Sequence, residues 1–346
     1  MKIATLLMVK NESKRILTTL NSLKNKITFL IVLDTGSEDN TIELIKKYCD
    51  ENNIKLFLKE TIFKNFEETR NELINFADTF NFDYYLLMDC NDELKNDIPD
   101  ILDKDAYLIR QEWFSGIITS YWNIRMIKAN IGWKYKGKVH EYLINNNNNN
   151  NIEKLKNFYL FQDRTQDDDK TYYRFNNDKI ILLEEYEKDS NDPRTVFYLA
   201  QTFMCLGEKD NAEKYFKIRS NMLNGFYEER FHSFLILGTL TDNISYYLLS
   251  LSICIRVEPL IKISEYYRKQ KNWNLSYLYC KIACELKYPE ECKLFVNKND
   301  YDYYRWHLLG IVSYYCNQME DGVLGCKKAI ENKNLEIDKY NLKFYF

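Results

Sequence analysis

The most constraining feature of this sequence is a short apolar run that ends in a cluster of acidic and amide side chains. The run covers residues 84–88, and three carboxylates and an amide follow it directly: Asp89, Asn91, Asp92 and Glu93. A short apolar run of this kind is typical of a buried parallel strand, and ligands bind at the carboxyl edge of such sheets. Because the carboxylates would repel one another, the cluster indicates a divalent metal with a phosphorylated ligand. The alternative is a solvated acidic turn.

Three other apolar runs precede this one, and stretches of helical periodicity separate them. They cover residues 3–9, 29–33 and 54–58. After the second run, Asn40 and Glu43 have the spacing of a capping box, which predicts the start of a helix. Strands that alternate with helices predict a parallel α/β sheet. The polar residues that follow the strands are then expected to share one edge: Asn11, Glu12, Asp34 and Asp89. No GxGxxG or GxxxxGKS/T motif follows a strand, so dehydrogenases and P-loop NTPases lose support.

Composition limits the classes of protein further. A length of 346 residues predicts two domains, and a net charge of -3 gives no overall basic field for nucleic acid. The nine cysteines include no CxxC pair, which favours reduced thiols over disulfides or a zinc site. The apolar start is too short for a signal peptide, and no later run is long enough for a transmembrane segment. We therefore expect a soluble, cytoplasmic protein.

Four motifs occur in order within the first 94 residues. They read LLMVKNES at 6–13, IVLDTGSEDNT at 31–41, NFEETRN at 65–71 and LLMDCNDEL at 86–94. This set resembles the family 2 glycosyltransferases with the GT-A fold, whose typical patterns are VKNE, DTGSxDNT, FxxxRN and DADDEL. The resemblance implies a Rossmann-like α/β GT-A domain with a mostly parallel sheet over residues 1–165. It also implies a nucleotide-sugar donor, with UDP as the nucleotide.

The resemblance assigns roles in donor binding to residues that match these motifs. Asn11, Glu12 and Asp34 would line the base and ribose pocket, and Asp39 would support the turn beside it. Arg70 would lie near the pyrophosphate, because a guanidinium fork suits phosphate oxygens. The full set of implied donor-binding residues is Asn11, Glu12, Asp34, Asp39, Arg70, Asp89 and Lys170, with Arg174 as a further pyrophosphate candidate.

The resemblance also implies Mn²⁺ or Mg²⁺ as a cofactor. Its ligands would come from Asp89, Asn91, Asp92 and His140. Position 91 departs from the family pattern, because it is Asn where an Asp is typical. An amide oxygen can bind either ion but brings no charge, so metal affinity should fall unless Asp92 takes over.

The segment GKVHE at 137–141 resembles the end of the family's acceptor side. A carboxylate there could take the proton of the acceptor hydroxyl, which makes Glu141 a candidate general base and Asp163 its rival. Trp113 and Gln111 could shape the sugar pocket, or Trp113 could belong to the core. Each candidate taken singly could also be an ordinary turn or surface residue; Arg70, for example, could pair with Glu67.

From about residue 172 onward, the sequence predicts only helices. Residues with tetratricopeptide-repeat spacing recur in three stretches, at 199–216, 263–283 and 306–329. Residues 172–346 are therefore expected to form an all-α helical-repeat domain. It could stabilise the first domain, bind an acceptor protein or mediate self-association into a homo-oligomer. The asparagine run at 145–151 is expected to be a surface loop.

These observations favour an inverting glycosyltransferase that moves a sugar from a nucleotide-sugar donor to a hydroxyl of a glycan or protein acceptor. No nucleic-acid partner is expected. The alternative is a catalytically weakened transferase fold that acts as a helical-repeat interaction scaffold. Asn91 favours the scaffold, whereas the retained Asp34, Arg70, Asp89 and His140/Glu141 pair favour the enzyme.

Overall fold

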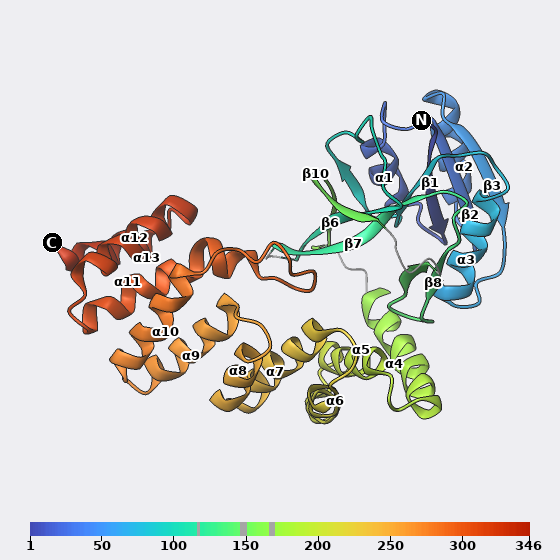
Figure 1. The fold of residues 1–346 in the computed structure, drawn as a ribbon. Helices are drawn as coiled ribbons and strands as arrows, with labels where there is room; N and C mark the ends of the chain where they lie inside the picture. The colour runs from blue at the N-terminus through green and yellow to red at the C-terminus, as the bar shows by residue number, and fades with distance from the viewer. Residues whose placement is uncertain (116–117, 146–150, 166–169) are drawn as a thin grey trace. The chain divides into compact units, whose positions relative to one another are not determined.

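The computed structural model describes residues 1–115, 118–145, 151–165 and 170–346 (Figure 1). Its contacts divide the chain into two compact units, one over most of residues 1–167 and one from residue 168 to the end. The first unit contains the sheet, and the second is helical. The asparagine run that was predicted to be a loop lies, at 146–150, outside the described residues.

The first unit is built on an eight-stranded mixed sheet. The first four strands pair in parallel, β4 with β7 and β10 with β5 are antiparallel, and β6 and β10 are parallel. This arrangement confirms the predicted, mostly parallel α/β fold. A separate hairpin is formed by β8 (Trp133–Lys136) and β9 (Tyr142–Asn145). The order across the sheet is β3 (Lys55–Glu60), β2 (Phe29–Asp34), β1 (Ile3–Val9), β4 (Tyr84–Met88), β7 (Ile118–Lys128), β6 (Ala106–Phe114), β10 (Ile152–Asp163) and β5 (Glu93–Lys95).

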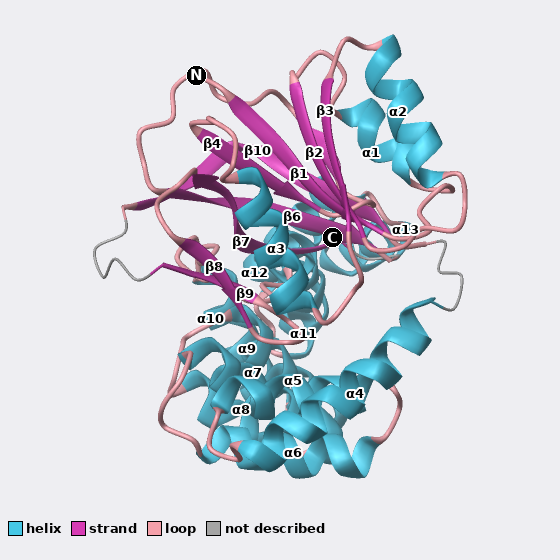
Figure 2. Cartoon of the chain, turned by 90° about the vertical axis from the view of Figure 1, so that its right-hand side faces the viewer, coloured by secondary structure: helices cyan, strands magenta, loops and turns pink. Residues whose placement is uncertain are grey.

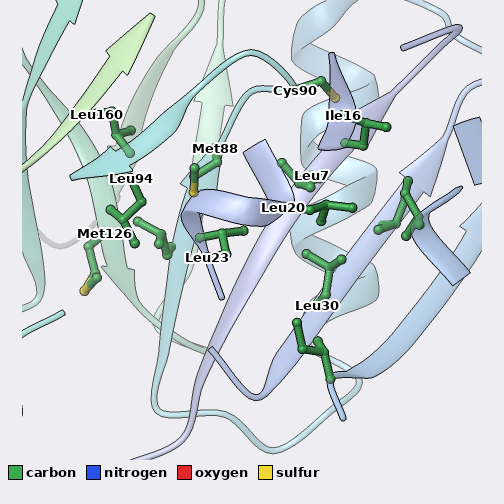
Figure 3. Packing of buried hydrophobic residues seen from close by; sticks show 14 of the residues in the cluster. Leu7, Ile16, Leu20, Leu23, Leu30, Met88, Cys90, Leu94, Met126 and Leu160 are labelled. Carbon is green, nitrogen blue, oxygen red and sulfur yellow. The ribbon is translucent and has the colours of Figure 1, made fainter. Parts of the chain in front are cut away.

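Helices cover both faces of the parallel half of this sheet. On one face, α1 (Ile16–Ser22) and α2 (Thr41–Glu51) cover alternate strand residues, and Figure 3 shows Leu20 near Leu7 and Leu30. On the other face, α3 (Phe66–Ala77) packs on the residues in between, such as Leu6 and Leu87. Figure 2 shows α1 and α2 together on their side of the strands. Each fully buried leucine stabilises the fold by about 1.5–3 kcal/mol, so the carboxyl edge of the sheet rests on a rigid base.

The start of α2 differs from the capping box that the sequence predicts. Asn40 occupies the N-cap position, but its side chain makes no capping hydrogen bond. Asp39 accepts instead from the backbone N–H of Thr41 at 3.0 Å and from the Thr41 hydroxyl. The capping box is therefore wrong, and an acidic residue one position earlier satisfies the helix start.

The second unit is a series of helices in which each packs against the next along the chain. The three predicted repeats correspond to the pairs α5/α6, α9/α10 and α11/α12. In the last pair, a Cβ added to Gly325 would lie 2.6 Å from the backbone nitrogen of Gly310, so a side chain at this position would separate the helices. The helices are α4 (Lys170–Lys188), α5 (Pro193–Cys205), α6 (Lys209–Asn221), α7 (Tyr227–Thr241), α8 (Ile244–Leu251), α9 (Val257–Lys269), α10 (Trp273–Glu285), the π-helical η1 (Asp300–Tyr304), α11 (Arg305–Tyr315), α12 (Met319–Lys333), α13 (Glu336–Leu342) and the 3₁₀ turn η2 (Lys343–Tyr345).

Within the described residues, no helix combines the length and apolar character needed to cross a membrane.

Candidate active site

The carboxyl ends of three neighbouring strands place the predicted site residues at one edge of the sheet. β1 lies between β2 and β4, with Val9 opposite Asp34 and Leu7 opposite Met88. Asn11 and Glu12 follow β1, Asp34 ends β2, and Asp89 follows β4. Parallel strands present their carboxyl ends on the same side, so these residues gather there.

The loops after β1 and β2 are joined by hydrogen bonds of the predicted donor-binding residues. Asn11 has a left-handed backbone (φ 53°), which an asparagine tolerates, and its side-chain oxygen accepts from the N–H of Glu38 at 2.7 Å. Asp39 accepts from the N–H of Ser13 at 3.1 Å. Hydrogen bonds from Thr41 and Ser13 hold the pKa of Asp39 well below its usual range. Asn11 and Asp39 therefore shape the turn beside the site.

Asp34 is a buried carboxylate held by its own turn. Its oxygens accept from the Ser37 hydroxyl at 2.7 Å and from the Ser37 N–H at 3.1 Å, and 4% of the residue is exposed. The N–H of the half-buried Glu12 donates to the Thr41 hydroxyl at 2.7 Å. A carboxylate fixed in this way keeps one position, which suits recognition of a hydroxyl or an N–H group.

Two arginines hold the carboxylate at the end of β4. Arg70 of α3 contacts Asp89 at 2.6 Å, and Arg125 of β7 contacts the second oxygen of Asp89 at 2.9 Å. Arg70 also contacts Glu141, which lies just before β9, at 2.6 Å. Both arginine side chains are 10% exposed, and those of Asp89 and Glu141 are 28% and 15% exposed. We refer to Glu141, Arg70, Asp89 and Arg125 as the arginine–carboxylate network.

The electrostatics of the network follow from its geometry. Burial alone would raise the pKa of Asp89, but the charges of Arg125 and Arg70 hold it well below its usual range. Burial alone would lower the pKa of Arg70, but the negative charges of Asp89 and Glu141 raise it well above its ordinary value. Arg70, Asp89 and Arg125 therefore keep their charges at neutral pH, and their contacts fix α3, the end of β4 and β7 relative to one another.

Asp92, which was predicted to be a metal ligand, is buried inside the acidic turn. It is 0% exposed, and its two oxygens accept from the N–H of Asp89 at 2.8 Å and from the Gln162 amide at 2.6 Å. The side-chain oxygen of Asn91 accepts from the same Gln162 amide at 3.2 Å. Asp92 therefore shapes the turn from within, and Gln162 of β10 binds both residues.

Gln162 and Arg164 are site residues that the sequence analysis did not identify. The Gln162 oxygen accepts from two nitrogens of Arg164, at 3.0 and 2.7 Å. The guanidinium of Arg164 lies 3.8 Å from the centre of the Trp113 ring, which in turn contacts Tyr121 at 5.2 Å. A signal existed, because Gln162 directly follows the apolar run at 158–161 in β10. Its partner in the turn could not be inferred from the sequence.

The family pattern implies a divalent metal, and the donor atoms here do not fit one. Both oxygens of Asp89 contact arginines, those of Asp92 are bonded inside the protein, and that of Asn91 accepts from Gln162. His140 is half-buried in a left-handed backbone (φ 51°). Across the described ranges, no three His, Cys, Asp or Glu side chains are grouped so that they could hold an ion.

The two candidate bases have different surroundings. Glu141 is part of the arginine–carboxylate network, and it lines a cavity of about 20 Å³ that has room for a single water molecule. The exposed Asp163 turns back to accept from the N–H and hydroxyl of Thr165 at 2.9 and 2.7 Å, which lowers its pKa. The side chain of Lys170 lies outside the described part of the chain, and Arg174 belongs to the second unit.

Asp92 predicts a pH dependence of folding stability. Burial and, after it, the charge of Asp89 raise its pKa from 3.8 to about 6, so the folded state holds this proton more tightly than the unfolded chain. The resulting stability is complete below the unfolded pKa and is lost as the pH rises through the folded pKa. As the pH rises from about 4 to 7, the free energy of unfolding of Asp92→Asn should therefore increase by about 2–3 kcal/mol relative to that of wild type. Urea unfolding across this range checks it, and a difference that does not change with pH would contradict it.

The comparisons with known proteins point to one family. The family model described as glycosyl transferase family 2 matches residues 6–169. The SPbeta prophage-derived glycosyltransferase SunS of Bacillus subtilis is 27% identical over 236 residues, which cover 65% of this chain and 54% of SunS. The chain thus spans about half the length of this curated relative.

Solved structures resemble the chain at low sequence identity. TarS 1–349 of S. aureus, solved in complex with UDP-GlcNAc, is 14% identical with a TM-score of 0.36, over 80% of this chain and 89% of TarS. YrrB, a TPR protein with an unusual peptide-binding site, is 12% identical with a TM-score of 0.37, over 47% of this chain and 81% of YrrB.

Proposed function

We propose that this chain, whose residues 6–169 form a glycosyl transferase family 2 domain, moves a sugar from a nucleotide-sugar donor to an acceptor hydroxyl. The observation that carries this proposal is the arginine–carboxylate network at the carboxyl edge of the sheet. It holds cationic groups, which suit a diphosphate, beside a carboxylate that can take a proton. We propose residues 1–165 as the catalytic domain, UDP as the nucleotide, and a glycan or a protein as the acceptor.

The proposed reaction is a single displacement with inversion. The acceptor oxygen forms a bond to the anomeric carbon, the bond from that carbon to the diphosphate oxygen breaks, and the diphosphate leaves with the electron pair. Glu141 takes the acceptor proton, which is typically worth about 10²- to 10⁴-fold in rate. Arg70 fixes the Glu141 carboxylate at 2.6 Å. The family commonly uses Mn²⁺ or Mg²⁺, but this mechanism assigns no step to either ion because the donor atoms around Asp89 do not fit one.

A thermal-shift screen tests the proposal. The purified full chain is heated with UDP, GDP, CDP or TDP, each with Mn²⁺ and with EDTA. A ligand that binds only the native state raises its stability by about 2.7 kcal/mol at one hundred times its dissociation constant. We expect UDP to give the largest shift. If folded protein shifts with none of the four, the nucleotide-sugar proposal fails.

That failure would favour the second candidate function, a transferase fold that serves as a helical-repeat scaffold. The observation in its favour is Asn91, which lacks the charge typical of the family at this position. Within the enzyme proposal, the helical unit from residue 172 would bind a protein acceptor or a second copy of the chain. We also propose a cytoplasmic location, because all nine cysteines are free thiols.

A further inference from the structure

We propose that guanidinium groups take the place of the divalent cation in this donor site, with Arg164 binding the diphosphate of the nucleotide. This inference rests on the proposed function, because it concerns how the same donor is held. It departs from the family pattern, in which a metal ion carries the diphosphate. Three features of the described residues support it.

The first feature is the charge around Asp89. A divalent ion needs a carboxylate whose charge is not already balanced, yet two arginines contact Asp89 at 2.6 and 2.9 Å. Their guanidinium groups would repel a metal ion that approached the same carboxylate. The planar fork of a guanidinium group also matches the geometry of phosphate oxygens.

The second feature is position 91. The substitution of Asn for the usual Asp removes one negative charge from the turn, and its amide oxygen accepts from Gln162 at 3.2 Å. Asp92 cannot compensate, because it is 0% exposed and both its oxygens are bonded within the protein. The turn has therefore lost charge at the position where a metal site would need it most.

The third feature is the support of Arg164. Two of its nitrogens donate to the side-chain oxygen of Gln162, at 3.0 and 2.7 Å. The guanidinium plane is also held 3.8 Å from the centre of the Trp113 ring. Gln162 also binds Asn91 and Asp92, so it links Arg164 to the turn at which the family pattern places the ion. A fixed guanidinium fork suits the oxygens of a diphosphate better than a mobile lysine would.

Arg164 could instead serve only to hold Trp113 and the end of β10. The two roles differ in what they predict for ligands with and without phosphate. If Arg164 contacts the diphosphate, replacing it weakens the binding of UDP but not of uridine. If its role is only structural, replacing it weakens the binding of both. Arg164→Gln is the suitable variant, because it keeps a planar group that can donate to Gln162 and stack on Trp113, yet removes the charge.

Arg110→Gln provides a matched control. Arg110 also lies over an aromatic ring, that of Tyr159 at 4.9 Å, and it lies on β6, the strand that carries Trp113. It occupies the face of β6 opposite Trp113, since residues three positions apart on a strand point to opposite faces. Its loss should leave the binding of both UDP and uridine unchanged.

The test is isothermal titration of the full-length protein with UDP and with uridine, in Mn²⁺ and in EDTA. We expect wild type to bind UDP with dissociation constants that agree within about threefold in the two buffers. Arg164→Gln should weaken UDP at least about 10-fold and leave uridine unchanged, as for a lost charge-assisted hydrogen bond. Asn91→Asp should bind UDP at least about 10-fold more tightly in Mn²⁺ than in EDTA, because it restores a charged ligand.

The outcomes separate this inference from the function on which it rests. Wild type that binds UDP only in Mn²⁺ would overturn the inference and leave the glycosyltransferase proposal standing. The inference would also fail if Arg164→Gln weakened uridine as much as UDP. If neither UDP nor GDP, CDP or TDP binds in either buffer, the proposed function itself fails.

Discussion

Replacing Glu141 with glutamine is expected to cut sugar transfer at least about 100-fold while donor binding stays nearly unchanged. The amide cannot take the proton of the acceptor, but it has the same shape as the carboxylate, which contacts Arg70 at 2.6 Å in wild type. The network should therefore keep its geometry. The measurement is the initial rate of transfer at saturating donor, together with titration of UDP into the same protein.

Two further variants make this result specific. Glu112→Gln is a matched control, because the Glu112 side chain is also 15% exposed and also contacts an arginine Nε, that of Arg110 at 3.1 Å. It should keep full activity. Asp163→Asn tests the rival base, and we expect a loss below about 10-fold because Asp163 is exposed and bonded to Thr165. Full transfer by Glu141→Gln with a large loss in Asp163→Asn would move the base role to Asp163.

The sequence predicted the strands that support the site because their burial is continuous. Ile3–Val9 and Tyr84–Met88 appear with the expected bounds, and each is nearly free of polar residues. Short apolar runs of this length, each followed by polar residues, are typical of buried strands of an α/β sheet. The gathering of strand ends at one edge then follows from parallel pairing alone, without knowledge of any side-chain contact.

The partners within the site could not be inferred in the same way. Helical spacing offered Glu67 as an ion-pair partner for Arg70. In the structure, Arg70 contacts Asp89 and Glu141 instead. Glu67 accepts a hydrogen bond from the N–H of Gly137. This choice depends on how α3 packs against the β8–β9 hairpin, and helical spacing carries no information about that packing. Likewise, Gln162 meets the acidic turn from a position 70 residues beyond Asp92.

The burial of Asp92 did leave a signal in the sequence. Its neighbours two positions away, Cys90 and Leu94, are apolar and buried, so an alternating pattern runs through the acidic turn. Alternation of this kind predicts that Asp92 points inward with them. A count of the charges in the cluster does not reveal this pattern, because a buried carboxylate bonded to Gln162 and an exposed one contribute the same charge to the count.

Replacing Arg70 with methionine is expected to destabilise the first unit by about 3 kcal/mol at pH 7, because it leaves two partly buried carboxylates without their shared partner. Asp89 keeps Arg125, but Glu141 loses the one arginine that contacts it among the described residues. Hydrogen exchange of the buried amides in β1 and β4 reports the free energy of unfolding of this unit separately from the helical one. Arg110→Met, whose arginine is 31% exposed and pairs with Glu112, should cost below about 1 kcal/mol.

The pH dependence identifies the cause of this loss. The arginines hold the pKa of Asp89 below its usual range, so the stability it contributes is present above the unfolded pKa and is lost as the pH falls through the folded value. Removing Arg70 raises the pKa of Asp89 towards its unfolded value, so the stability that their contact contributes is lost between about pH 4 and the folded pKa of Asp89. The difference between wild type and Arg70→Met should thus shrink from pH 7 to about pH 2. An equal loss at both values would mean that the packing of Arg70 over the Tyr135 ring, at 5.4 Å, accounts for the effect in place of the carboxylates.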